Sequence, residues 1–175
     1  MNDRFGISVG GVAGAIIPFL CGILGALAAN VPIAFLDGRV PQPLLSLMPV
    51  YFWCMVRPDL LPAGAVFVIG LSEDLLSGGP PGVWALSYLV CFAIIGRQRD
   101  TFAGLAGYGA ILGFAAIMFI ASGTAYVIVS ILYSRLLPIE TMILELAMSV
   151  LFYVPALWLM NAIQHRFIGP LRGDF

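Results

Sequence analysis

The sequence predicts an all-helical integral membrane protein in which six transmembrane helices form a single domain, residues 1–175. The 175 residues are 61% hydrophobic and 10% charged, whereas a soluble domain carries roughly 25% charged residues. The mean hydropathy is +1.04, and long uncharged segments alternate with short polar connections along the chain. So little polar surface cannot cover a water-soluble core, and we therefore expect the helices to lie in a bilayer.

Six apolar segments have lengths that suit, or nearly suit, transmembrane helices. We expect spans at about residues 9–36, 43–57, 61–76, 82–96, 102–133 and 139–164. The first span lies in an uncharged stretch, Phe5 to Leu36, that exceeds the roughly 20 residues needed to cross a bilayer. This stretch predicts one span with a bent or surface-lying extension, and it is too long for a cleavable signal peptide.

The second segment is unusually short. Leu44 to Val56 carries no charge and is interrupted by Pro49. About thirteen helical residues reach only ~20 Å, whereas the hydrocarbon core of a bilayer is about 30 Å thick. We expect that neighbouring helices shield this segment, that the bilayer thins locally, or that the helix extends past its polar ends.

Six spans place both ends of the chain on the same side of the membrane. If the ends are cytoplasmic, the arginines on the inner side are Arg4, Arg57, Arg97, Arg99, Arg166 and Arg172, and those outside are Arg39 and Arg135. Arginine-rich connections stay in the cytoplasm, so this division predicts an N-in, C-in orientation. The acids that fall on the outer side are Asp37, Glu73, Asp74, Glu140 and Glu145.

The stretch from Phe67 to Ala85 predicts a helical hairpin. An apolar run leads into two adjacent acids, Glu73 and Asp74, and a second apolar run begins at Val83. The turn between the runs reads Ser77-Gly78-Gly79-Pro80-Pro81-Gly82. Its glycines permit backbone angles with φ > 0, and its prolines prevent the helix from continuing. We therefore expect a tight hairpin with an acid at its inner corner.

Asp74 has two interpretations that the sequence leaves open. Its carboxylate pairs with Arg135 or Arg39, which ties the hairpin to another span, or it caps the turn by accepting backbone N–H bonds. We interpret Glu73 as polarity at a helix end near the membrane surface, where it is a further candidate for a charge pair. Glu145 lies deeper in the last segment, so we expect it to contact a partner helix.

The sequence does not predict an enzyme. It contains no nucleophile with a neighbouring base, no phosphate-binding loop and no soluble catalytic domain, so we expect no catalytic residues and no cofactor. Cys21, Cys54 and Cys91 each lie inside an apolar run without metal-site spacing, which predicts reduced thiols and no metal site. A net charge of −1 gives no reason to expect a nucleic-acid partner.

The hairpin carries a motif that resembles a known family. The pattern Gly70-x-x-x-Asp74-Leu75-x-Ser77-Gly78, followed by Gly82 at the start of the next helix, resembles the rod shape-determining protein MreD. Members of that family are small polytopic proteins of the bacterial inner membrane. The length of the chain and the number of expected spans agree with the resemblance over nearly the whole sequence.

The resemblance implies a non-enzymatic component of the bacterial cell-elongation complex. Such a protein binds MreC, a periplasmic scaffold with a single span, and belongs with RodA, its transpeptidase partner and, indirectly, MreB. By this resemblance the chain supports peptidoglycan synthesis and rod cell shape, and its fold is similar to that of the substrate-capture subunits of energy-coupling-factor transporters. Because the connections are short, we expect its contacts to be lateral, with membrane lipids and other helices.

Two other functions remain open. The first is a substrate-binding membrane subunit of a vitamin-type transporter, which needs a polar pocket that opens to the outside; the outer acids are candidates to line one, although the spans carry few polar side chains. The second is a proton-coupled transporter that uses Asp74 or Glu145. This role is less favoured because both acids lie toward one edge of their spans rather than at mid-membrane.

Overall fold

The computed structural model describes residues 9–31, 42–103, 108–134 and 139–168, and this part of the chain is helical without a strand. The elements are α1 (Val9–Ala29), α2 (Leu47–Val56), a 3-10 turn η2 (Pro58–Leu60), α3 (Ala63–Ser77), α4 (Val83–Ala103), α5 (Tyr108–Tyr133), α6 (Ile139–Ile163) and a π-helical end η3 (Gln164–Ile168). The expected all-helical class is confirmed for the described residues, and each expected span overlaps one of the six described α-helices.

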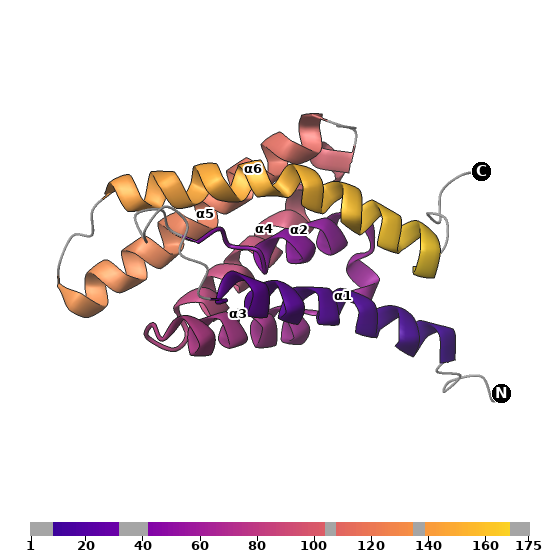
Figure 1. Cartoon of the computed structure of the whole chain (residues 1–175), viewed down its shortest axis with the longest axis horizontal. Helices are drawn as coiled ribbons and strands as arrows, with labels where there is room; N and C mark the ends of the chain where they lie inside the picture. Colours follow the sequence, from indigo (N-terminus) through magenta and orange to yellow (C-terminus); the bar gives the residue numbers. More distant parts are fainter. Residues whose placement is uncertain (1–8, 32–41, 104–107, 135–138, 169–175) are drawn as a thin grey trace.

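The helices run side by side along the long axis of the molecule (Figure 1). α1 begins and α6 ends at the same end of the bundle, whereas the turn between α3 and α4 lies at the opposite end, where α5 also ends. We call this opposite end the hairpin end. An even number of helices that run back and forth along the bundle brings the start of α1 and the end of α6 to the same end.

α2 occupies the core of the bundle. Eight of its ten residues are buried, and it contacts α1, α4, α5 and α6. The ring of Tyr51 on α2 meets Phe114 of α5 and Tyr153 of α6 edge-on, at centroid distances of 5.6 and 5.8 Å. A ten-residue helix is only ~15 Å long, so it reaches about half the thickness of a bilayer core. Neighbouring helices shield it, which was the first of the three expected accommodations.

Helix bounds differ from the expected spans at several ends. α1 ends at Ala29, and the extension expected beyond it falls mostly at residues 32–41, outside the described part of the chain. α4 continues to Ala103 instead of ending near residue 96. A charged residue such as Arg97 makes burial of a helix in lipid unfavourable, but it does not end the helical backbone. The sequence has no proline or glycine between Arg97 and Ala103 that would interrupt α4.

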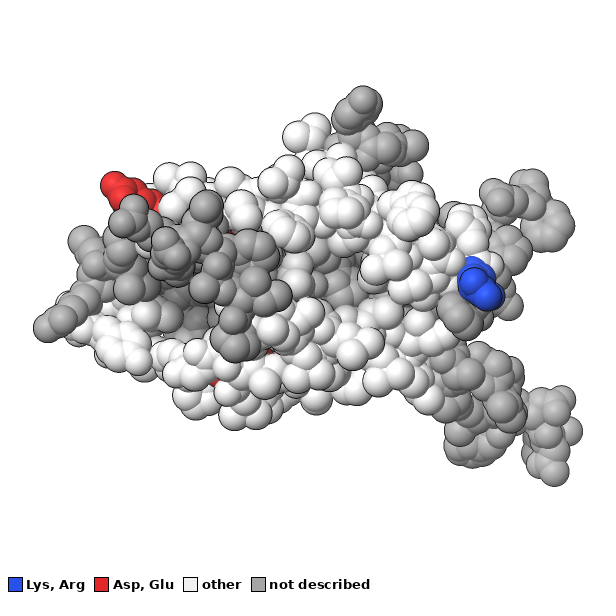
Figure 2. All heavy atoms as spheres, viewed as in Figure 1, with Lys and Arg blue, Asp and Glu red and all other residues white. Residues whose placement is uncertain are grey.

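The outer surface of the bundle is apolar. Leu112, Ile131 and Trp158 have exposed fractions of 71, 73 and 75%. In the view of Figure 2, acidic atoms appear in one half of the molecule and a basic group at the opposite end, with uncharged residues between them. Two described segments, Gly109–Tyr133 and Ile139–Arg166, are long and apolar enough to cross a membrane, and only a minor part of each is buried inside the bundle. Long apolar helices with exposed faces fit a membrane protein better than a soluble core.

Candidate functional site: the α3–α4 hairpin and an adjoining cavity

Asp74 caps the first turn of α4 from the neighbouring helix α3. Its Oδ2 accepts the backbone N–H groups of Gly82 at 2.9 Å and Ala85 at 3.2 Å, and its Oδ1 accepts that of Trp84 at 2.8 Å. The first N–H groups of a helix have no partner within the helix, and a carboxylate there also interacts favourably with the helix dipole. The capping interpretation of Asp74 is therefore confirmed.

The other interpretation of Asp74, an ion pair with Arg39 or Arg135, is not tested by these hydrogen bonds. Arg39 and Arg135 lie outside the described residues, so a pair between Asp74 and either arginine stays a prediction. Both carboxylate oxygens of Asp74 already have backbone donors, and the side chain is 2% exposed. The contacts that fix the hairpin are thus complete without an arginine.

The glycines of the motif permit the close approach and the turn. A Cβ atom on Gly70 would lie 2.7 Å from the Cα of Ala85, so only glycine lets α3 pack this closely on α4. Gly78 and Gly82 have φ angles of 68° and 101°, a region that side chains other than hydrogen rarely tolerate. Ser77 donates from Oγ to the backbone carbonyl of Asp74 at 3.3 Å. Gly70, Asp74, Ser77, Gly78 and Gly82 therefore all take part in one hairpin.

Glu73 differs from its expected role at the membrane surface. It is only 3% exposed, and its carboxylate accepts hydrogen bonds from Asn30 Nδ2 at 2.8 Å and Ser46 Oγ at 2.5 Å. Ser46 Oγ also lies 2.5 Å from the hydroxyl of Tyr88. Because the single proton of Ser46 goes to Glu73, Tyr88 must donate to Ser46. Within the described residues the partners of Glu73 are polar groups rather than an arginine.

This polar network ties four segments together at the hairpin end of the bundle. Asn30 follows α1, Ser46 precedes α2, and Tyr88 lies on α4. Adjacent helical residues point about 100° apart, so Glu73 reaches toward α1 and α2 while Asp74 reaches the start of α4. The two adjacent acids therefore have separate sets of partners.

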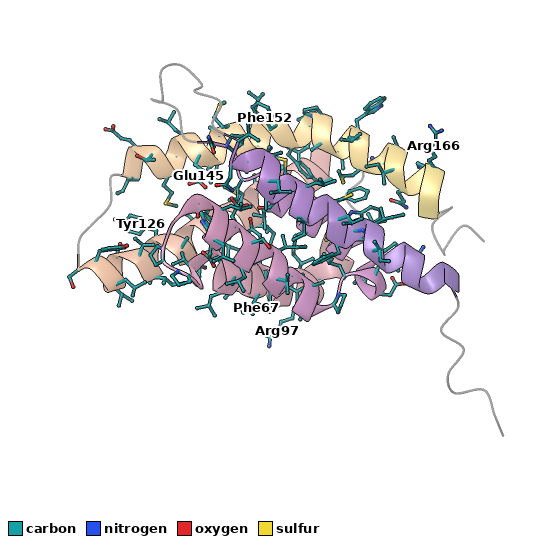
Figure 3. All side chains as sticks on the ribbon, turned by 60° about the horizontal axis from the view of Figure 1, so that its bottom comes forward. Phe67, Arg97, Tyr126, Glu145, Phe152 and Arg166 are labelled. Atoms are coloured by element: carbon teal, nitrogen blue, oxygen red, sulfur yellow. The ribbon has the colours of Figure 1, made fainter. Side chains whose placement is uncertain are left out.

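A cavity of about 400 Å³ lies between the hairpin, α5 and α6. Its polar lining residues are Asp74 and Ser77 of the hairpin, Ser122 and Tyr126 of α5, and Thr141 and Glu145 of α6. The remaining wall is largely apolar. Figure 3 shows Glu145 and Tyr126 in the same half of the bundle, with Arg166 at the far end of α6.

Two polar groups of the cavity wall have no partner within the described part of the chain. The carboxylate of Glu145 makes no hydrogen bond and no ion pair there; the one ion pair found among those residues joins Arg57 to Asp59. Ser122 is 4% exposed, and its Oγ has no hydrogen-bond partner. Buried polar groups are normally hydrogen-bonded. The unpartnered hydroxyl of Ser122 in the cavity wall is therefore an exception that calls for an explanation.

The predicted site residues are thus brought together only in part. Gly70, Asp74, Ser77, Gly78 and Gly82 form the hairpin, and Glu145 shares the cavity wall with Asp74 and Ser77. Sequence reasoning missed the roles of Asn30, Ser46 and Tyr88, and it considered a pocket lined by outer acids only for the alternative transporter function. The described residues contain no group of three or more His, Cys, Asp or Glu that would hold a metal ion.

Comparison with known proteins gives no further assignment. No family model, no curated protein and no solved structure matches the chain.

Proposed function

We propose that the chain is a six-span protein of the bacterial inner membrane, with both ends in the cytoplasm, and that it is a non-enzymatic component of the cell-elongation complex. In this role it docks MreC, the single-span periplasmic scaffold, and supports peptidoglycan synthesis by RodA and its transpeptidase partner. The observation that carries the proposal is the hairpin. Gly70, Asp74 and Gly82 carry the resemblance to MreD. Gly70 packs closely against Ala85 of α4, and the carboxylate of Asp74 accepts the backbone N–H of Gly82.

The distribution of polar and apolar groups supports a membrane role. Glu73 and Asp74 lie in the last turns of α3, next to the turn of the hairpin, and Figure 3 shows Glu145 in the same half of the bundle and Arg166 at the opposite end. Basic residues favour the cytoplasmic side of a membrane, so the hairpin end is assigned to the outer side. The exposed apolar faces of α5 and α6 leave lateral contact with lipid or with another helix as the main mode of interaction.

Co-purification tests the proposed partner directly. The full chain carries a C-terminal tag, is produced in a rod-shaped bacterium and is extracted with a mild detergent. We expect MreC to be recovered in near-stoichiometric amount by quantitative mass spectrometry, with RodA and its transpeptidase in smaller amounts. An unrelated tagged six-span protein is the bait control. Recovery of no more MreC than that control would contradict the proposal.

Two variants refine this experiment. Asp74→Asn weakens the acceptor that holds the hairpin, and we expect it to lower the recovery of MreC. Asp59→Ala changes a carboxylate that pairs with Arg57 at 3.4 Å and is 60% exposed, so recovery should be unchanged. Only samples that elute as a single folded species in detergent are compared, which separates a docking defect from unfolding.

The cavity supports one alternative function, that of a transporter subunit. The cavity beside the hairpin is the feature that a substrate-capture subunit of a vitamin-type transporter would need. The same co-purification distinguishes the two functions, because such a subunit would recover ATP-binding transporter subunits instead of MreC.

A further inference from the structure

The cavity at the hairpin end has the size and the wall of a ligand site. Its volume of about 400 Å³ lies within the roughly 300–1,000 Å³ range typical of small-molecule pockets. Most of the wall is apolar, with a few polar groups that converge on it from three different helices. Such a combination binds the body of a ligand by burial and orients it by its polar group.

The charges of the described wall residues indicate that the ligand is positively charged. Asp74 and Glu145 are both acidic, and the described lining residues include no Lys, Arg or His. Asp74 is already engaged by three backbone N–H groups. Glu145 has no partner among the described residues, so its carboxylate is the group left to meet a cation.

The remaining wall fits the rest of such a ligand. Trp84 and Tyr126 line the cavity, and aromatic faces attract organic cations as well as apolar groups. Ser122 adds a buried hydroxyl without a hydrogen-bond partner, which supplies an acceptor for an N–H group. An anion would be repelled by the carboxylate of Glu145, and a wholly apolar molecule would leave both Glu145 and Ser122 without a hydrogen-bond partner.

We propose that this cavity binds a small organic cation, with a protonated amine against Glu145 and an apolar or aromatic body beside Trp84 and Tyr126. The inference goes beyond the proposed function and does not depend on it, since MreC recovery and ligand binding are measured separately. The amine belongs either to a free molecule or to the head group of phosphatidylethanolamine.

A titration with matched probes tests the proposal. The full chain is placed in nanodiscs of phosphatidylglycerol, which has no amine, and phenethylamine is titrated in by isothermal calorimetry. We expect saturable binding of one molecule per chain. 2-Phenylethanol has the same body without the charge, and we expect it to bind at least about tenfold more weakly, because a charge-assisted hydrogen bond is lost.

Variants locate the binding to the cavity. Glu145→Gln should weaken phenethylamine at least about tenfold and leave 2-phenylethanol nearly unchanged. Glu140→Gln removes the same charge from an exposed position in the first turn of the same helix, and it should leave both probes unchanged. The comparison of the two probes on the unaltered chain remains decisive even if the Glu145 variant does not fold.

The lipid arm of the experiment identifies the source of the amine. If phosphatidylethanolamine is a natural occupant, adding it to the nanodiscs should raise the apparent dissociation constant of phenethylamine; if the occupant is a free amine, the constant should not change. Both results support a cation site. Absence of phenethylamine binding in phosphatidylglycerol, or equal binding of the charged and uncharged probes, overturns the proposal.

Discussion

Asp74→Ala is expected to lower the free energy of unfolding by roughly 2–4 kcal/mol. The substitution removes both oxygens that accept the N–H groups of Gly82, Trp84 and Ala85, and the side chain is 2% exposed, so water cannot readily replace them. The loss is measured by unfolding the purified protein in mixed detergent micelles with increasing sodium dodecyl sulfate, followed by circular dichroism.

Two further variants define the cause of that loss. Asp74→Asn keeps one acceptor oxygen, so its stability should lie between those of the alanine variant and the unaltered chain. Asp59→Ala removes an exposed carboxylate whose pair with Arg57 is worth about 0–1 kcal/mol. If Asp74→Ala is no less stable than Asp59→Ala, the carboxylate cap does not hold the hairpin.

Gly70→Ala is expected to destabilise the protein by about 1–3 kcal/mol, the usual cost of overpacking a close contact. The new methyl group would lie 2.7 Å from the Cα of Ala85 and 2.9 Å from its backbone nitrogen. Backbone atoms cannot turn aside as a flexible side chain does, so α3 and α4 must separate. The shift also strains the bonds from Asp74 to the first turn of α4.

The matched control for this change lies on the same helix. A Cβ on Gly64 meets nothing within 4 Å, and alanine favours a helix over glycine by up to about 1 kcal/mol. Gly64→Ala should therefore be neutral or stabilising in the same detergent titration. Equal stability of the two alanine variants would mean that the tight contact between α3 and α4 contributes nothing.

The hairpin was predictable from sequence because its signals are local. Apolar runs on both sides, glycines with freedom at φ > 0 and a Pro80-Pro81 pair that stops a helix all act within twenty residues of each other. The choice between a cap and an ion pair for Asp74 also had a local clue. Pro80, Pro81 and Gly82 provide no side-chain acceptor for the start of α4, so that helix needs a carboxylate from elsewhere.

The network around Glu73 was not predictable in the same way. Asn30, Ser46 and Tyr88 come from segments that are separated by many residues, and each is an ordinary polar residue in an apolar sequence. Their meeting depends on how α1, α2 and α4 pack on α3. The pattern beside the turn suggested helix-end polarity for Glu73 because nothing local shows that two other segments cover it.

The shielding of the short second segment was predictable from local sequence, whereas the cavity was not. The length of Leu44 to Val56 predicted that α2 needs shielding, and its burial among four other α-helices confirms this. The cavity arises because the hairpin, α5 and α6 leave about 400 Å³ between them. No residue pattern along a single helix encodes such a gap, and the depth of Glu145 in its segment predicted only a contact with a partner helix.

Cysteine labelling determines whether the hairpin lies on the outer face of a six-span membrane bundle, as we propose. Single cysteines replace Gly79 in the hairpin or His165 after α6, in a chain whose three native cysteines are changed to alanine. A membrane-impermeant maleimide is added to spheroplasts with an intact inner membrane. We expect labelling of Gly79→Cys in intact spheroplasts and of His165→Cys only after permeabilisation. Labelling of both cysteines from the same side, or in the reverse order, would contradict the proposed orientation.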